Sequence, residues 1–410
     1  MQFINNQFQI QGLNVSELCK EFGTPLYIYD GEKIVSQYHK LANAFTGVNV
    51  KIKYAAKALT NQAILKLLNK VGCGIDVVSL QELKLALLAG FTKENIMYTP
   101  NCVPFEEIEE AVKTGVIINI DNLPFLERFG KKYGHSHPCS IRLNPHIEEG
   151  GNAKIMTAHK GSKFGISVEQ VERIYAISKE YNLNVLGLHV HMGSDFKSAD
   201  SFIKAYEIVF DIARNFKELK FLDFGGGFKV AYKEGDSVTD VNDLGVKMTA
   251  AFSAFCKEYG KNLELWFEPG KFLVSESGYL MVKATVIKET PATTFIGVDS
   301  GLNHLIRPMM YGAYHDVVNV SNNNGAKKKY TVVGYICETD TFGTDLQIAE
   351  TKEGDLLAIK NAGAYGFSMS SNYNSRFRPA EVLVYNGKAQ LIRKREVFED
   401  LLKNQVDVAL

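Results

Sequence analysis

Short apolar runs alternate with amphipathic stretches between residues 48 and 268, and this alternation predicts the architecture. The apolar runs fit strands near 48–55, 73–78, 95–99, 116–120, 138–143, 185–191, 219–224 and 263–268. The stretches between them repeat apolar residues three and four positions apart, as helices do, over 80–88, 105–113, 122–133, 168–181, 199–216 and 240–259. Eight strand–helix units in about 220 residues favour a (β/α)₈ TIM-type barrel over a doubly wound open sheet.

After Gly270 the pattern changes to strands that are separated by Gly and Asn turns. Strand-like runs follow at 279–287, 294–298, 330–335, 355–360 and 381–385, without helical stretches between them. Residues 25–30 are also strand-like and fit either part of the chain. We therefore predict two domains: a barrel over 34–272, and an all-β, barrel-like domain formed by 1–33 and 273–410.

Composition and charge exclude several classes of partner. The 410 residues carry 46 basic and 46 acidic side chains, and this zero formal charge argues against nucleic acid or an anionic membrane. No apolar run is long enough for a membrane span, and the first residues do not resemble a signal peptide. The six cysteines contain no C-x-x-C pair, so we expect a cytoplasmic protein with free thiols and no metal site.

Polar and glycine residues follow the carboxyl ends of the predicted strands, where barrels of this kind hold their sites. In chain order they are Lys57, Asp76, Ser79, Arg142, His189, His191, the glycines 225–227, and Glu268 to Lys271. A random surface distribution would not gather them at one rim. The sequence therefore predicts a site at that end of the barrel.

Three of these side chains have a defined chemical use. Lys57 lies where a strand gives way to a helix, and desolvation there would lower the pKa of its amine and make it a nucleophile. Glu268, deep in the barrel mouth, needs a partner, and a protonated pyridine nitrogen would serve. His191 presents a flat ring for stacking. The alternatives are a surface lysine, an ion pair and a structural histidine.

The glycine triplet predicts a phosphate site. Gly225, Gly226 and Gly227 would let backbone N–H groups approach a phosphate, and the Ser194 hydroxyl would add a donor. A flexible turn and a helix cap are the alternatives. Together, a nucleophilic lysine, a phosphate cradle, a stacking ring and an acid for a pyridinium describe a pyridoxal 5′-phosphate (PLP) site.

Six motifs resemble those of the alanine-racemase-fold PLP-dependent decarboxylases. They are Tyr54-Ala-Ala-Lys57-Ala58, His189-Val-His-Met-Gly-Ser194, Asp223-Phe-Gly-Gly-Gly227, Glu268-Pro-Gly270, Cys337-Glu338 and Gly363-Ala-Tyr365. Within that group the chain is most similar to the diaminopimelate decarboxylase family, from Gly23 to Leu383. The resemblance implies decarboxylation of meso-2,6-diaminopimelate to L-lysine and CO₂, the last step of lysine biosynthesis.

The substrate depends on a further segment, Arg307 to His315, which is similar to the one that holds the distal end of the substrate in that family. An arginine suits a carboxylate, whereas an ornithine or arginine decarboxylase needs an acid for a distal cation. One departure concerns Lys271: the family commonly has arginine there, reaching phosphate and substrate carboxylate. Lysine keeps the charge but not the two-pronged geometry.

The resemblance also implies residue roles and an assembly. Lys57 would hold PLP as a Schiff base, Glu268 would keep the ring nitrogen protonated, and His191 would stack on the ring. The distal end of the substrate would meet Arg307, Tyr311 and Glu338, while Cys337 would protonate the carbon that loses CO₂, with Tyr365 beside the cofactor. The β-domain residues would act across the interface of a homodimer with shared active sites.

Three rival functions use the same scaffold. An amino-acid racemase needs a weakly protonated pyridine, which Glu268 disfavours. A carboxynorspermidine, ornithine or arginine decarboxylase is disfavoured by Arg307 and Tyr311. A non-catalytic PLP carrier would be expected to lose Lys57 or Cys337, and both are present.

Overall fold

A computed structural model describes residues 1–147, 157–195 and 199–409. The chain forms two compact units, which are described separately. The β unit comprises Met1–Ile34, Tyr232–Asp236 and Val274–Leu410, and the barrel unit comprises Val35–Ala231 and Ser237–Leu273. The predicted ranges placed 232–236 in the barrel domain, and the structure groups these residues with the β unit instead.

Eight parallel strands close the barrel, as predicted. They are β5 (Asn49–Ala55), β6 (Gly74–Val77), β7 (Ile96–Tyr98), β8 (Ile117–Ile120), β9 (Pro138–Asn144), β11 (Asn184–Val190), β12 (Phe221–Asp223) and β13 (Glu264–Phe267). β13 pairs with β5, and β8 pairs with β9, so no edge remains between them. A short strand, β10 (Ile166–Ser167), adds to β9. The TIM-type prediction is confirmed.

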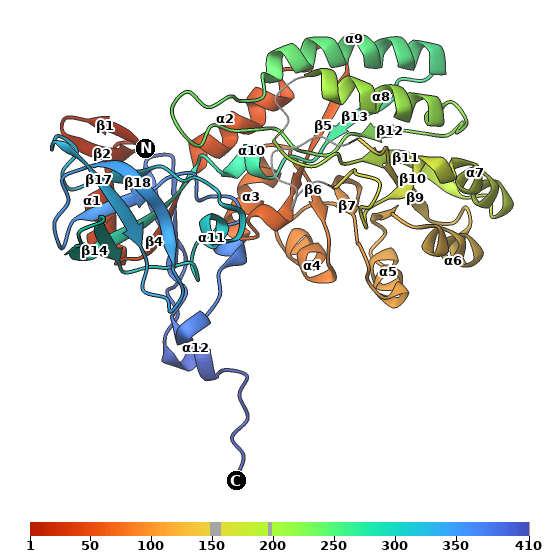
Figure 1. Cartoon of the computed structure of the whole chain (residues 1–410). Coiled ribbons are helices and arrows are strands. Elements are labelled where there is room, and N and C mark those ends of the chain that lie inside the picture. Colours follow the sequence, from red (N-terminus) through yellow and green to blue (C-terminus); the bar gives the residue numbers. More distant parts are fainter. Residues whose placement is uncertain (148–156, 196–198, 410) are drawn as a thin grey trace. The chain divides into compact units, whose positions relative to one another are not determined.

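Helices cover the outside of these strands (Figure 1). They are α3 (Gln62–Lys70), α4 (Leu80–Leu88), α5 (Phe105–Val112), α6 (Leu123–Tyr133), α7 (Val171–Glu180), α8 (Ala199–Ala213) and α9 (Val241–Tyr259). Side-chain caps begin several of them: Ser79 Oγ accepts the Glu82 N–H at the start of α4. Ser79 thus lies just after the carboxyl end of β6, where the sequence placed it, and its hydroxyl caps α4.

The β unit is built around a long strand, β14 (Gly278–Glu289), which pairs with β4 (Leu26–Asp30), β15 (Thr294–Val298) and β19 (Leu356–Ile359). The strand-like residues 25–30 therefore join this unit as β4. The sheet continues through β17 (Lys327–Val333) and β18 (Thr341–Ala349) on one side, and β20 (Ala380–Tyr385) and β21 (Lys388–Arg393) on the other. Strands β18 and β21 were not predicted, because both alternate polar side chains with few apolar ones.

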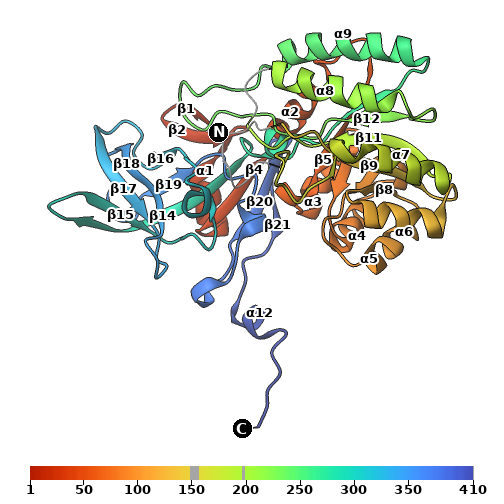
Figure 2. The same cartoon turned by 45° about the vertical axis from the view of Figure 1, so that its right-hand side comes forward.

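Smaller elements complete the β unit. β1 (Gln2–Ile4), β2 (Gln7–Ile10) and β3 (Leu13–Asn14) form a separate antiparallel sheet, β16 (Val317–Asn319) pairs with β19, and α1 (Val15–Phe22) packs nearby. After β21 the chain forms α12 (Phe398–Leu402) and extends away from the strands of its unit (Figure 2). Among the described residues, no helix has both the length and the apolarity that a membrane crossing requires.

Candidate active site

A buried hydrogen-bonded pair, His189 and Glu268, stands at the centre of the barrel mouth. His189, on β11, donates its Nε2–H to Glu268 Oε2 over 3.1 Å, and both side chains are buried. Burial alone would raise the pKa of Glu268, but His189, His191 and Lys57 outweigh it and lower that pKa to about 2. Glu268 is therefore ionised. Its second oxygen, Oε1, has no hydrogen-bond partner among the described residues.

Two further carboxyl groups face the same space. Asp223 ends β12, and its side chain lies with those of His189 and Glu268, ligand atoms within 4.8 Å of one another. Asp76 lies on β6. Burial, then the negative charge of Glu268, raise the pKa of both aspartates well above its ordinary value. The cluster thus keeps one carboxylate ionised and favours protons on the other two.

Lys57 lies in a short 3₁₀ turn (η1, Ala56–Ala58) directly after β5, as the pattern predicted. A hydrogen bond from Ala55 N to Pro269 O, 3.2 Å long, ties this turn to the loop that carries Glu268. The Lys57 ammonium helps to lower the pKa of Glu268 and of His191. Its side chain is exposed, so the chain alone does not supply the desolvation that we expected around the amine.

The glycine triplet allows three loops to approach each other closely. Gly225 has a φ of +66°, and a Cβ there would lie 2.6 Å from His191 Nδ1; a Cβ on Gly226 would lie 2.5 Å from the Glu268 carbonyl oxygen. Gly225 N–H donates to Asp223 Oδ1 at 2.9 Å, and Gly226 N–H donates to His191 Nδ1 at 3.1 Å. Two of the three N–H groups are thus used within the chain, and only that of Gly227 has no such bond among the described residues.

The bond from Gly226 also fixes the state of His191. Because Nδ1 accepts a hydrogen, the neutral ring carries its proton on Nε2. Burial, with the charges of Lys57 and Arg142, lowers the pKa of His191 well below its ordinary value. A neutral imidazole, held by its edge, keeps its face available to a ring.

Lys271 and Ser194 meet at Asp195. Lys271 begins α10 (Lys271–Val274), and its Nζ lies 2.5 Å from Asp195 Oδ1, with only 11% and 20% of the two side chains exposed. Ser194 Oγ lies 3.5 Å from Asp195 Oδ2. Helix α8 begins at Ala199, so Ser194 is not its cap. The two side chains predicted to contact the phosphate, Lys271 and Ser194, thus both lie at Asp195.

Arg142, on β9, is a second buried cation of the barrel. Its guanidinium carbon lies 4.7 Å from the centroid of the Phe164 ring. Burial lowers the pKa of Arg142, and the charges of Glu268 and Asp121 oppose that shift. Arg142 thus supplies positive charge to the carboxyl cluster without a direct salt bridge among the described residues.

In the β unit, Arg307 lies between two tyrosines. It begins α11 (Arg307–Tyr311), is 9% exposed, and donates from Nη2 to Tyr232 Oη over 3.3 Å. Its guanidinium carbon lies 5.6 Å from the Tyr232 ring and 5.9 Å from the Tyr365 ring. Tyr365 has a φ of +56°, a conformation rare for a bulky residue. Tyr311 ends the same helix and is half-buried.

Cys337 and Glu338 form a second polar group of the β unit. Both are exposed, so Cys337 is not a small core residue. Asn374 Nδ2 donates to Cys337 Sγ at 3.0 Å, and Tyr373 Oη donates to Glu338 Oε1 at 2.8 Å. The next residue, Thr339, contacts Met309 of α11, so the segment that carries Arg307 lies beside this group.

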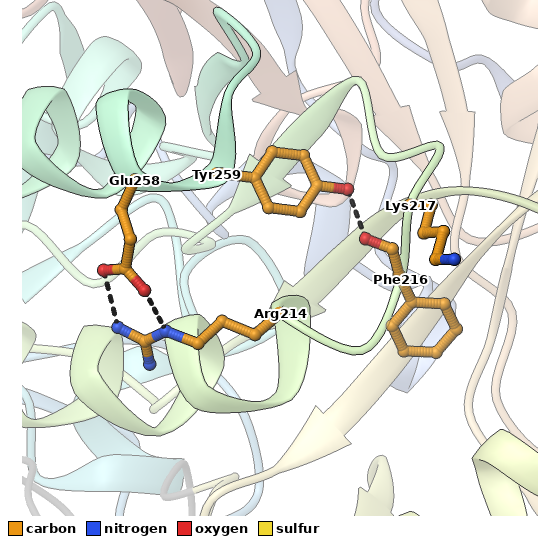
Figure 3. Close-up of a pocket in the computed structure, with 5 residues that line it drawn as sticks. All are labelled: Arg214, Phe216, Lys217, Glu258 and Tyr259. Atoms are coloured by element: carbon orange, nitrogen blue, oxygen red, sulfur yellow. Dashed lines mark hydrogen bonds and ion pairs between the residues drawn. The ribbon is translucent and has the colours of Figure 1, made fainter.

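A surface pocket of the barrel unit lies between the ends of α8 and α9 (Figure 3). Arg214 and Glu258 pair through two bonds there, Nε to Oε1 at 2.6 Å and Nη2 to Oε2 at 3.0 Å. Tyr259 donates its hydroxyl to the Phe216 carbonyl. Arg214 with Glu258, and Tyr259 with Phe216, are thus hydrogen-bonded to each other, and Lys217 also lines the pocket.

Sequence reasoning missed two interior residues. Asp223 was quoted in a motif but received no role, and Lys53, on β5, was not considered. The alternation of side chains along β5 could have identified Lys53, because residues two apart in a strand share a face. Lys53 lies two residues before Ala55, and Lys57 follows two residues after Ala55. Lys53 is 2% exposed.

The barrel cluster fits a phosphorylated pyridine aldehyde. The Oε1 of ionised Glu268 can accept a hydrogen bond from a ring N–H. The glycine triplet offers the N–H of Gly227 to a phosphate, and its residues have no side chains that would block the approach. An exposed amine stands at the same rim. The trio of His189, Asp223 and Glu268 could also hold a metal ion, but Lys57 has no use in such a site.

Comparisons with known proteins agree with this chemistry. Residues 31–275 match the family described as pyridoxal-dependent decarboxylase, pyridoxal binding domain. The diaminopimelate decarboxylase of Methanothermobacter thermautotrophicus is 39% identical, over 97% of this chain and 95% of its own. A crystal structure of diaminopimelate decarboxylase from Methanocaldococcus jannaschii has a TM-score of 0.91 at 34% identity, and the match covers 99% of this chain and 98% of that one. The Helicobacter pylori enzyme complexed with L-lysine has a TM-score of 0.88 at 32% identity, covering 95% and 98%.

Proposed function

This chain belongs to the diaminopimelate decarboxylase family of pyridoxal-dependent decarboxylases, and we propose that it converts meso-2,6-diaminopimelate to L-lysine and CO₂. The bond from the carbon at the D-configured centre to its carboxylate breaks, CO₂ leaves, and a proton takes its place. The observation that carries the proposal is the ionised Glu268 with an unpartnered Oε1 in a barrel mouth that also holds Lys57.

The barrel residues would hold PLP. Bound PLP accepts the electron pair that CO₂ leaves behind. Glu268 Oε1 accepts a hydrogen bond from the ring N–H and so keeps that proton in place. Lys57 would supply the amine that anchors the cofactor, and the neutral ring of His191 would pack against it.

The phosphate would be bound at the loops around His191. Gly227 N–H is the backbone donor of the triplet that has no partner among the described residues. The Ser194 hydroxyl, 3.5 Å from Asp195 Oδ2, would add a side-chain donor. Lys271 adds a cation, which its pairing with Asp195 orients. Gly225 and Gly226 act indirectly, because their small size lets the loops meet.

The β unit would recognise the distal end of the substrate. Arg307 suits the distal carboxylate, because its planar guanidinium presents two parallel donors. Tyr311 would contact the same end, and Glu338 would accept the distal ammonium. An L-lysine complex of the Helicobacter pylori relative supports an amino-acid ligand of this length.

Cys337 would deliver the proton to the carbon that has lost CO₂. The Cys337 thiol is exposed, and Asn374 holds its sulfur at 3.0 Å. Tyr365, beside Arg307, would contact the cofactor. We further propose a homodimer in which Cys337, Glu338 and Tyr365 of one subunit serve the barrel of the other.

A racemase is the alternative chemistry on this scaffold. That reaction is served by a weakly protonated ring nitrogen. The ionised carboxylate of Glu268 favours the opposite state, so decarboxylation remains the proposal.

The test is CO₂ release from meso-diaminopimelate, ornithine and arginine in parallel, with PLP added and Lys57→Ala as the control. We expect release from meso-diaminopimelate, with L-lysine as the product and little turnover of the other two. Preference for ornithine or arginine would overturn the substrate while leaving the cofactor intact.

A further inference from the structure

One fully buried cation of the barrel has no place in the chemistry above. Lys53 lies on β5 with 2% of its surface exposed. Its Nζ lies 4.0 Å from the centroid of the Trp266 ring and donates a hydrogen bond to the Glu94 carbonyl at 3.5 Å. Among the described residues, no carboxylate oxygen lies within ion-pair distance of this ammonium.

An ammonium buried in this way is unfavourable for folding, because it has lost its water without gaining a paired anion. Burial lowers the pKa of Lys53 to about 8, against the opposing pull of Asp223 and then Glu268. An apolar side chain would fill the same space at less cost. The Lys53 charge therefore acts at short range on the ionisable groups around it, Asp223 and Glu268 first among them.

The ammonium is held firmly. The ring of Trp266 stacks on that of Phe221, with centroids 3.5 Å apart and planes 3° from parallel, and Trp266 Nε1 donates to Glu264 Oε2 at 2.8 Å. Gly74 pairs with Lys53 across the strands, and a Cβ there would lie 3.0 Å from Lys53 Cγ. Trp266 and Phe221, the aromatic floor, thus fix the position of the charge.

The aromatic floor lies one layer below the carboxyl cluster. Asp223 follows Phe221 by two residues on β12, and Glu268 follows Trp266 by two residues at the end of β13. In a strand, side chains two apart share a face and lie about 7 Å apart along the chain. The Lys53 charge therefore acts on Asp223 and Glu268 from beneath, without contact.

We propose that Lys53 is a positioning residue of the cofactor site, whose charge on the aromatic floor offsets the carboxylates of Asp223 and Glu268 above it. This rests on the proposed function, since Glu268 would hold the ring nitrogen. The other charged or titratable groups that face this interior are Asp76 on β6, Arg142 on β9, His189 on β11 and Glu264 on β13.

Removing one positive charge raises the pKa of every neighbouring titratable group. A neutral residue at position 53 should therefore raise the acid–base midpoints of the site, by about one pH unit. Lys53→Arg keeps the charge and should leave them near those of the parent protein. Lys51→Met, at an exposed position of the same strand, is the matched control.

The first measurement follows Lys53 itself. Trp266 is the single tryptophan of the chain, so its fluorescence reports the ammonium above its ring. In the full chain without added PLP, we expect a fluorescence transition near pH 8, retained in Lys51→Met and absent in Lys53→Met. A parent protein without this transition would overturn the assigned position of the charge.

The second measurement follows the site. The absorbance of bound PLP is titrated with pH in the parent, Lys53→Met and Lys53→Arg, with Lys53→Gln as a second neutral variant if the methionine variant does not fold. A raised midpoint in the neutral variants alone supports the role. Equal midpoints in all of them would refute it. If the parent binds no PLP, the proposed function fails instead, and the fluorescence result still stands.

Discussion

His189 Nε2 and Glu268 Oε2 lie 3.1 Å apart in the barrel mouth, and the other carboxylate oxygen, Glu268 Oε1, has no hydrogen-bond partner in the described part of the chain. The histidine is uncharged, because burial lowers its pKa, so it orients the carboxylate without neutralising it. The net negative charge of the pair is thus available to a protonated ring nitrogen.

Replacing Glu268 by Gln should remove that charge while preserving shape. We expect kcat to fall by roughly 100-fold, about 2.7 kcal/mol, because the ring nitrogen loses its proton-holding partner. Steady-state kinetics with meso-diaminopimelate measure the loss. Glu268→Asp, which keeps the charge, is the control, and a Gln variant as active as the parent would contradict the role.

Replacing Lys57 by Ala should abolish the covalent attachment of PLP. Borohydride reduction followed by mass spectrometry should find the cofactor on Lys57 in the parent and on no lysine in the variant. Activity should fall by at least about 1000-fold. Lys51→Met, exposed and on the same strand, should label normally. Labelling of another lysine in the parent would disprove the assignment.

Arg307 should affect substrate binding more than cofactor binding. In Arg307→Met the distal carboxylate loses its two parallel donors, so KM for meso-diaminopimelate should rise roughly 10- to 100-fold. Arg307→Lys keeps the charge but loses the two parallel donors, so its KM should lie between those of the parent and of Arg307→Met. The absorbance of bound PLP should not change. An unaltered KM in the methionine variant would exclude distal recognition by this residue.

Shared sites predict complementation between inactive subunits. Lys57→Ala disables the barrel and Cys337→Ala disables the β unit, so a mixed dimer would contain one intact site. Subunits that have been mixed and allowed to exchange should recover up to about a quarter of the parent activity, if they pair at random into dimers. Mass spectrometry of differently tagged chains confirms exchange. Exchange without recovery would show that each subunit uses its own residues.

His304 should make the fold acid-sensitive. Its Nε2 donates to the Phe377 carbonyl and its Nδ1 accepts from Ser300, both at 3.0 Å. Burial lowers the pKa of His304 to about 4, whereas 6.5 is its ordinary value. Between these values the unfolded chain binds the extra proton, so stability falls as pH falls from 6.5 to 4, by about 3 kcal/mol.

The measurement is urea unfolding at several pH values, for the parent and for His304→Gln. The variant cannot take up the proton, so its unfolding free energy should decline less over this range. Parallel curves for the two proteins would show that His304 does not cause the acid sensitivity.

The eight barrel strands could be predicted because most of them are short, largely apolar and buried runs, and most are followed by an amphipathic helix. The positions of Lys57 and Glu268 followed from topology, since parallel strands bring their carboxyl ends to one rim. The family was identified from motifs, and the comparisons confirm it. Strands β18 and β21 could not be found in the same way, because their side chains alternate without a strong apolar face.

The sequence by itself determined which chemical groups are present and at which end of the barrel they gather. Only the tertiary structure decided their states. Lys57 is exposed while Lys53, four residues earlier, is buried on Trp266, a difference that depends on neighbouring strands. Likewise Glu268 is ionised and Asp223 favours its proton, because a pKa depends on nearby charge and lost water, and folding sets both.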